Sequence, residues 1–249
     1  MFGDNPIREN EAHLDGASLA VQDIFYTLQG EGPQAGRAAV FVRLAGCNLA
    51  CTFCDTDFES KIDNRLTLNQ IMHVVCSMKN KAQLLVLTGG EPLRQNVLPL
   101  IEACLGAGFE LVQIETAGTL WQEGLEDWAD GTSPKVQIVC SPKTPRVHPR
   151  LPLFCDHYKY IIEAGRISRE DGLPTWGTQA STEKMPQKLY RPSHGGTIWV
   201  SPCDPGAGNG ANGMTSDQIH QKNIRAATGS ALSYGYRLSL QMHKLVGLP

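Results

Sequence analysis

The sequence predicts an α/β fold in which a parallel sheet forms an incomplete, TIM-like barrel of six βα units. Three observations lead to this prediction. Short apolar runs alternate with longer segments of helical periodicity, which is the pattern of βα units around a parallel sheet. The chain carries six such units, whereas a complete TIM barrel has eight. Every unusual motif directly follows a predicted strand, and barrel proteins place their functional groups at that end of the strands.

The individual elements follow from apolar runs and from the turn signals between them. The six core strands are expected at residues 38–46, 83–88, 109–114, 136–140, 158–162 and 197–200. Helices with an apolar face are expected at 68–79, 97–107 and 217–232, and further strands at 21–29 and 236–241. We expect one domain over residues 1–249, with a loose N-terminal arm over 1–19 and a long loop or insertion over 165–195.

The composition restricts the class of protein. The 249 residues are 41% hydrophobic and 19% charged, as in an ordinary globular domain. The net charge of −3 provides neither a basic footprint for nucleic acid nor a polybasic membrane signal. The first residues lack the apolar core of a signal peptide, and no segment approaches the ~20 apolar residues of a membrane span. We therefore expect a cytoplasmic protein that binds neither membranes nor nucleic acid, with its eight cysteines reduced or bound to metal.

Three cysteines with the spacing C-x₃-C-x₂-C follow the predicted strand at 38–46. They are Cys47, Cys51 and Cys54. Gly46, directly before them, allows the sharp turn that brings the thiols together. Three thiolates on one loop suit an iron–sulfur cluster or zinc. A cluster held by only three cysteines leaves one iron free to bind another molecule.

Zinc is the alternative at this loop. Structural zinc takes four protein ligands. His73 or Cys76 could supply the fourth, but both fall in the predicted helix at 68–79, away from the loop. A non-catalytic zinc-binding module is therefore kept as an alternative to a cluster.

The cysteine loop resembles the signature of the radical S-adenosylmethionine superfamily, C-x₃-C-x-aromatic-C, with Phe53 as its aromatic residue. The resemblance implies a [4Fe–4S] cluster on the three thiolates, S-adenosylmethionine on the fourth iron, and Phe53 near the adenine. Gly89-Gly90-Glu91-Pro92 follows another strand and by itself indicates a turn before a helix. Beside the cysteine loop it resembles the superfamily's glycine-rich motif, in which Glu91 accepts the ammonium of the methionine moiety.

Four stretches narrow the resemblance to the 7-carboxy-7-deazaguanine synthases. They are residues 25–32, 54–57, 115–118 and 237–244. The resemblance implies conversion of 6-carboxy-5,6,7,8-tetrahydropterin to 7-carboxy-7-deazaguanine with release of ammonia, in the biosynthesis of queuosine and other 7-deazapurines. It also implies Mg²⁺, a homodimer, and an electron donor such as flavodoxin or ferredoxin.

The same resemblance assigns site residues by position, and it names no catalytic side chain beyond those that position cofactors. The residues expected at S-adenosylmethionine are Phe53, Asp55, Gly89, Gly90, Glu91, Gly118, Ser141, Pro142 and Lys143. The residues expected at the pterin are Leu28, Gln29, Gly30, Glu31, Arg43, Thr116, His243 and Pro249, the last through its α-carboxylate. Thr56 is expected at Mg²⁺, because a hydroxyl or carbonyl oxygen suits that ion.

Two stretches depart from the family pattern. The segment 165–195 is longer than the resemblance implies, and Ser201-Pro202 stands where a Gln-Pro pair is expected. The glycyl-radical activases are the alternative within the superfamily, but they commonly carry further cluster cysteines, and the sequence has no second cysteine motif. Residues 208–213 match G-x-G-x-x-G, yet they follow the sixth strand instead of the first, so we expect a flexible loop there.

Overall fold

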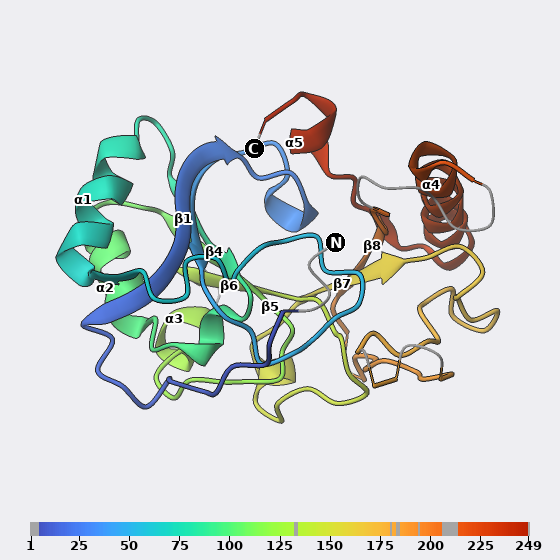
Figure 1. Ribbon diagram of the computed structural model, residues 1–249, viewed down its shortest axis with the longest axis horizontal. Helices are drawn as coiled ribbons and strands as arrows, with labels where there is room; N and C mark the ends of the chain where they lie inside the picture. The colour runs from blue at the N-terminus through green and yellow to red at the C-terminus, as the bar shows by residue number, and fades with distance from the viewer. Residues whose placement is uncertain are drawn as a thin grey trace.

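In the part of the chain that the structure describes, a nine-stranded sheet forms the centre of the protein (Figure 1). The computed structural model describes residues 5–131, 134–179, 181–182, 185–193, 195–205 and 214–248. The strand order is β3-β1-β2-β4-β5-β6-β7-β8-β9, with parallel pairing from β2 to β9 and antiparallel pairing of β1 with β2 and β3. Because β3 and β9 are the two edges, the barrel formed by the described residues is not closed. The expected incomplete barrel is therefore confirmed.

The six expected core strands and the three expected helices are present, with ends that differ by at most two residues, and the strand expected at 21–29 begins three residues earlier, at Ser18. The strands are β1 (Ser18–Leu28), β2 (Ala38–Leu44), β3 (Arg65–Thr67), β4 (Leu84–Gly89), β5 (Leu111–Thr116), β6 (Val136–Cys140), β7 (His157–Ile162), β8 (Thr197–Pro202) and β9 (Arg237–Leu238). The helices are α1 (Leu68–Met78), α2 (Leu98–Gly106), α3 (Glu126–Ala129), α4 (Ser216–Tyr234) and α5 (Met242–Leu245). No helix in the described part of the chain is both long enough and apolar enough to cross a membrane.

The inner face of the sheet changes from apolar to polar along the strands. Side chains alternate between the two faces of each strand. In β2, Val40 faces the large core, whereas Phe41 packs with Val86 of β4 in a small cluster inside the barrel. One further inward position along these strands, Arg43 lies in register with Thr88, and both line a cavity. Apolar side chains thus fill one end of the barrel, and polar side chains line the cavity at the other end.

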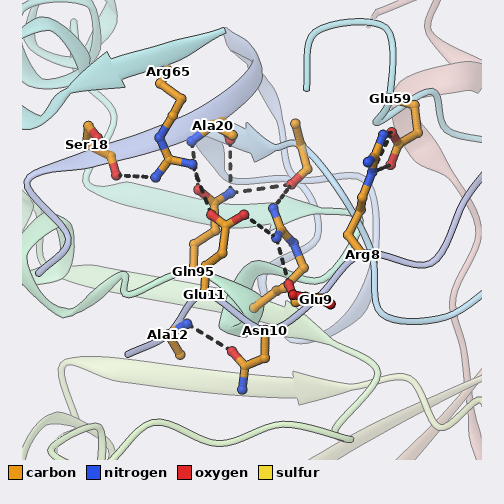
Figure 2. A network of polar contacts seen from close by, with 12 residues as sticks. Arg8, Glu9, Asn10, Glu11, Ala12, Ser18, Ala20, Glu59, Arg65 and Gln95 are labelled. Carbon is orange, nitrogen blue, oxygen red and sulfur yellow. Dashed lines mark hydrogen bonds and ion pairs between the residues drawn. The ribbon is translucent and has the colours of Figure 1, made fainter. Parts of the chain in front are cut away.

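The N-terminal arm, expected to be loose over residues 1–19, is held against the rest of the chain; its described part has no helix or strand before Ser18, where β1 begins. The Arg8 guanidinium bonds to the Glu59 carboxylate, with a shortest distance of 2.7 Å, and its backbone N–H donates to the Cys47 carbonyl at 2.7 Å. Glu11 pairs with the buried Arg94 at 3.0 Å. Figure 2 shows this network, in which Glu11 also bonds to Arg65 and Gln95 bonds to Ala20. The arm therefore packs against the cysteine loop.

Three stretches differ from, or fall outside, the sequence-based expectation. The last strand, expected at 236–241, is only the two-residue β9, because the chain then leaves the sheet edge and enters α5, where the Met242 N–H bonds to the Gly30 carbonyl. The described residues of the 165–195 segment contain no helix or strand and only isolated bridges. Residues 208–213 lie outside the described residues.

Candidate active site

Two adjoining cavities open at the ends of the parallel strands. The first has a volume of about 220 Å³ and is lined by the cysteine loop and by residues that follow β4, β5, β6 and β8. The second has a volume of about 410 Å³ and lies between β1, β2 and the C-terminal segment. The side chains that line both cavities are Glu31, Asp55, Thr56, Glu115, Lys159 and Gln241. The two cavities therefore meet at a wall that is rich in charge.

All three cysteines of the loop line the first cavity as free thiols. Gly46 has a φ of 78°, and a Cβ atom there would lie 2.8 Å from the Arg94 guanidinium, so the turn requires glycine. Burial raises the pKa of Cys47 to about 12, and the charge of Glu91 adds to this effect. Burial also raises the pKa of Cys54. A bound metal supplies the positive charge that deprotonates such thiols.

Neither of the two candidates for a fourth zinc ligand lines the first cavity. His73 and Cys76 occupy exposed positions on α1, away from the cavity. Among the described residues, no three His, Cys, Asp or Glu side chains are grouped so as to hold a single metal ion. The three thiols instead line a cavity, and this arrangement suits a polynuclear cluster.

The glycine motif after β4 lies directly against the cysteine loop. Gly89 has a φ of 134°, and a Cβ atom there would lie 2.1 Å from the Leu44 carbonyl oxygen. A Cβ atom at Gly90 would lie 2.1 Å from the Gly46 carbonyl oxygen. Both glycines line the first cavity, so their backbone is available to a ligand. Only glycine permits this close packing of two loops.

Glu91 does not face the cavity, which differs from the expected ammonium contact. Its carboxylate is fully buried and accepts hydrogen bonds from the Thr116 hydroxyl and the Ala117 N–H, both at 2.8 Å. It also accepts the Leu93 N–H at 3.0 Å. Burial raises the pKa of Glu91 despite these donors. The side chain thus ties the loop after β4 to the loop after β5, while the glycine backbone faces the ligand space.

Four other predicted cofactor residues line the first cavity, namely Phe53, Asp55, Ser141 and Lys143. The Lys143 ammonium lies 5.6 Å from the centroid of the Phe53 ring and donates to the Ser141 carbonyl at 3.3 Å and to its hydroxyl. Burial lowers the pKa of Lys143. These contacts bring the loop after β6 against the cysteine loop.

Gly118 and Pro142 are not on the wall of the first cavity. A Cβ atom at Gly118 would lie 2.6 Å from Cys140 Sγ, so the glycine lets the loop after β5 pack on β6. Pro142 lines a smaller neighbouring pocket together with Trp176 and Thr178 of the 165–195 segment. Both residues therefore pack behind the wall of the first cavity without lining it.

The second cavity contains most of the predicted substrate residues, namely Leu28, Gln29, Glu31, Arg43 and His243, whereas Thr116 lines the first cavity. The Arg43 guanidinium lies 5.1 Å from the centroid of the Phe25 ring. Arginine in this setting binds planar anions well. The Arg43 side chain thus faces the ligand space, as expected.

Glu115 is a cavity residue to which sequence reasoning gave no role. Its carboxylate accepts hydrogen bonds from Gln29 at 3.0 Å, from Thr88 at 3.1 Å and from Gln113 at 3.3 Å. The sequence feature that could have indicated a role for Glu115 is its position as an acidic residue at the end of a core strand.

The buried ion pair of Lys159 and Glu31 was also missed, although Glu31 itself was predicted. Lys159 lies on β7, and its side chain and that of Glu31 are about one-tenth exposed (11% and 10%). Burial opposes both charges, yet the Lys159 ammonium holds the pKa of Glu31 below its ordinary value, and Glu31 raises that of Lys159. The available signal was a lysine flanked on both sides by tyrosine within an apolar strand.

His243 closes one side of the second cavity at α5. A Cβ atom at Gly30 would lie 1.9 Å from His243 Nδ1, and the Met242 N–H donates to the Gly30 carbonyl at 3.1 Å. Burial lowers the pKa of His243, although Glu31 opposes this shift. Leu248 also lines the cavity, and the predicted ligand Pro249 lies outside the described residues.

Comparisons with known proteins agree with this geometry. The model of the family described as the Radical SAM superfamily matches residues 42–178. A 7-carboxy-7-deazaguanine synthase from Rhodospirillum rubrum is 45% identical over 99% of both chains, and one from Rickettsia prowazekii is 37% identical over 100% of this chain and 96% of its own. The crystal structure of QueE from Escherichia coli shares the fold, with a TM-score of 0.63 and 22% identity over 91% of this chain and 95% of that chain. The chain belongs to the radical SAM superfamily and, within it, to the 7-carboxy-7-deazaguanine synthase family.

Proposed function

We propose that the protein converts 6-carboxy-5,6,7,8-tetrahydropterin to 7-carboxy-7-deazaguanine with release of ammonia, in the biosynthesis of 7-deazapurines such as queuosine. The observation that carries this proposal is the pair of joined cavities in a chain that is 45% identical to a synthase of that name over its whole length. One cavity presents three thiols, and the other presents an arginine among buried polar side chains.

The residues present fit a [4Fe–4S] cluster and S-adenosylmethionine, which the superfamily implies. Cys47, Cys51 and Cys54 would hold the cluster, because soft thiolates are the usual ligands of such clusters. Gly89 and Gly90 would offer backbone groups to the methionine moiety. When bound, these cofactors supply one-electron reductive cleavage of a sulfonium and the radical chemistry that follows on the substrate.

The protein orients S-adenosylmethionine through the remaining wall of the first cavity. Phe53 would lie near the adenine, and Asp55 would accept hydrogen bonds. Ser141 and Lys143 would contact the cofactor from the loop after β6, with Lys143 supplying positive charge to a carboxylate. Glu91, Gly118 and Pro142 hold the loops after β4, β5 and β6 in place, and Thr116, which lines the first cavity, would contact the substrate.

The second cavity orients the pterin. Arg43 would bind the substrate carboxylate through a planar, charge-assisted contact. Gln29, Glu31 and His243 would offer acceptors and donors to the ring edges, and Leu28 and Gly30 would shape the cavity. The Pro249 carboxylate would accept the guanidine-like edge of the pterin, as a carboxylate accepts arginine.

Mg²⁺ would sit where the two cavities meet. Thr56 lines both cavities, and its hydroxyl lies 3.1 Å from an Asp55 carboxylate oxygen, so hard oxygen atoms are present there. Mg²⁺ commonly takes few protein ligands and completes its shell with water and substrate oxygens. Titrating turnover with Mg²⁺ in wild type and Thr56→Ala tests this role, and equal responses would exclude it.

The reaction also requires partners. An electron donor of the flavodoxin or ferredoxin class would supply the reducing electron. The family resemblance implies a homodimer, and the composition leads us to expect it in the cytoplasm. Light scattering of the purified protein measures the oligomer, and a reconstituted system with each donor measures its competence.

Anaerobic turnover with reductant, S-adenosylmethionine and the carboxytetrahydropterin tests the proposed function. We expect 7-carboxy-7-deazaguanine from the wild-type protein. Cys47→Ala, Cys51→Ala and Cys54→Ala should each lose the cluster absorption and the product, whereas Cys76→Ala, on the exposed face of α1, should keep both. A cysteine-loop variant with full activity would contradict the assignment.

A further inference from the structure

In the described part of the 165–195 segment, Thr178 and Gln179 bond to the cysteine loop. Cys51 and Gln179 form an isolated antiparallel bridge, and the Thr52 N–H donates to the Thr178 carbonyl at 2.9 Å. Thr178 is buried, and the Gln179 carbonyl accepts the Thr182 N–H at 2.8 Å. Both residues that contact the cysteine loop are therefore held in place by the rest of the protein. The superfamily match ends at residue 178, so Gln179 lies just beyond the matched residues.

Both polar atoms of the Gln179 side-chain amide are hydrogen-bonded, and these partners determine which way the amide faces. Its Oε1 accepts the Ala50 backbone N–H at 2.9 Å. Because a backbone N–H can only donate, Oε1 must face Ala50, and Nε2 must face the other way. The two protons of Nε2 then meet two acceptors, Thr178 Oγ1 at 2.8 Å and Cys51 Sγ at 3.2 Å. The amide thus donates to the sulfur of a predicted cluster ligand.

Hydrogen bonds of the Thr178 hydroxyl connect the Gln179–Cys51 contact to the loop after β6. The Thr178 hydroxyl accepts from Gln179 and donates to the Lys143 carbonyl at 2.6 Å. Lys143 and Cys51 both line the first cavity. A short chain of hydrogen bonds therefore connects a cluster ligand, the 165–195 segment and the loop expected at S-adenosylmethionine.

We propose that Gln179 is a positioning residue of the cluster site, which donates an N–H···S hydrogen bond to Cys51 and thereby raises the reduction potential of the cluster. The inference rests on the proposed [4Fe–4S] cofactor. Hydrogen bonds to cluster sulfurs are among the factors that set the potential. The reduced cluster carries one more negative charge than the oxidised one, so a donor at the sulfur stabilises the reduced form more. Thr178 and Gln179 of the long 165–195 segment are accordingly part of the cofactor site.

Two neutral variants of Gln179 test the hydrogen bond. Gln179→Leu and Gln179→Met remove the donor without adding charge. Gln187→Leu is the matched control, because Gln187 lies in the same segment and is linked to Thr175 through its backbone N–H. The measurement is an anaerobic potentiometric titration of the cluster, followed by EPR without S-adenosylmethionine, together with iron and sulfide content.

We expect both Gln179 variants to titrate at a more negative potential than the wild-type protein. The ratio of reduced to oxidised cluster at the wild-type midpoint should fall about threefold or more, which is about 28 mV for a one-electron couple. Gln187→Leu should titrate like the wild type. Gln179 variants with normal cluster content and an unchanged midpoint would overturn the proposal. A wild-type protein without a cluster signal would overturn the proposed cofactor as well, so the two failures are distinguishable.

Pulsed EPR of the wild-type protein tests the hydrogen bond to Cys51 even if the Gln179 variants do not bind a cluster. Wild-type protein is labelled with ¹⁵N only at glutamine side-chain amides, and the reduced cluster is measured by pulsed EPR. A ¹⁵N coupling is expected from Nε2 of Gln179 across the N–H···S contact. A cluster signal without this coupling would overturn the proposal.

Discussion

At the scale of single residues, the wall between the two cavities depends on the Lys159–Glu31 ion pair. Both side chains are nearly buried, and Gln241 also hydrogen-bonds to Glu31. Removing one partner of such a pair leaves an unpaired charge in a poorly solvated place, which typically costs about 3–5 kcal/mol. The pair therefore stabilises the fold as well as the shape of the substrate cavity.

We predict that Lys159→Met lowers the free energy of unfolding by about 3 kcal/mol at neutral pH. The folded-state pKa of Glu31 lies below its ordinary value of 4.5, so its contribution is present above pH 4.5 and is lost as pH falls through the folded value. The folded-state pKa of Lys159 lies above 10.5, so its contribution is present below that pH and is lost as pH rises through the folded value.

Urea unfolding across pH checks this prediction. The difference between wild type and Lys159→Met should be largest between pH 4.5 and 10.5 and should shrink below pH 4.5. The double variant Glu31→Gln/Lys159→Met should recover part of the loss, because it leaves no unpaired charge. An equal deficit at every pH would count against the ion pair as the cause.

We also predict that Gly30→Ala weakens substrate binding, because the added methyl would lie 1.9 Å from His243 Nδ1 and would displace that side chain. KM for the pterin should rise about tenfold, equivalent to about 1.4 kcal/mol, with cluster content unchanged. Gly106→Ala is the matched control, because a Cβ atom there meets nothing within 4 Å. Steady-state kinetics of the three proteins provide the test, and an unchanged KM in Gly30→Ala would contradict it.

Individual residues also show which features of the site could be predicted from the sequence and which could not. The cysteines and glycines were predictable, because their spacing and their place after strands indicate their geometry. Glu91 was placed against the ligand, but its carboxylate is turned into the protein by donors from β5 and the following loop. Gln179 was unpredictable, since its contact with Cys51 joins residues 128 positions apart in a segment without periodicity.

At the scale of elements, the cysteine loop is held between two segments without regular structure. The N-terminal arm contacts it through the Cys47 carbonyl, and the 165–195 segment contacts it through Ala50, Cys51 and Thr52. Neither segment has a hydrophobic period, so the sequence indicated only that both lack helices and strands. The core strands and helices were predictable because each is a distinct apolar run, whereas β3, α3 and α5 are at most four residues long.

We predict that Glu11→Ala destabilises the protein through the arm shown in Figure 2. The Arg94 guanidinium is 1% exposed and would lose its carboxylate partner, which should lower the free energy of unfolding by about 2 kcal/mol. The pKa of Glu11 is lowered, because bonds from Arg65 and Arg94 outweigh its burial. This contribution is therefore present above pH 4.5 and is lost as pH falls through the folded value.

The control for this prediction is Glu110→Ala, which removes an exposed ion pair with Arg37 at 3.7 Å. Such surface pairs contribute at most about 1 kcal/mol. Thermal unfolding of both variants, and the rate at which a chelator removes iron from the loaded protein, provide the comparison. A deficit in Glu11→Ala no larger than that in Glu110→Ala would show that the arm does not anchor the loop.

At the scale of the whole molecule, the parallel sheet places every functional loop at one end. The cysteine loop follows β2, the glycine motif follows β4, and the loops expected at the cofactor follow β5 and β6. This arrangement was predictable, because parallel strands bring their C-terminal ends to the same edge. The division into two cavities was not, since the second cavity is lined by residues of β1, β2 and the C-terminal segment, which lie far apart in the sequence.

The two cavities are expected to convert 6-carboxy-5,6,7,8-tetrahydropterin to 7-carboxy-7-deazaguanine with release of ammonia. The most direct measurement is the stoichiometry of anaerobic turnover, in which ammonia, 7-carboxy-7-deazaguanine and remaining S-adenosylmethionine are quantified in one reaction. We predict equimolar ammonia and deazaguanine, because each conversion of the pterin releases one molecule of ammonia. Loss of S-adenosylmethionine without formation of the deazaguanine, by protein that holds a full cluster, would contradict the account.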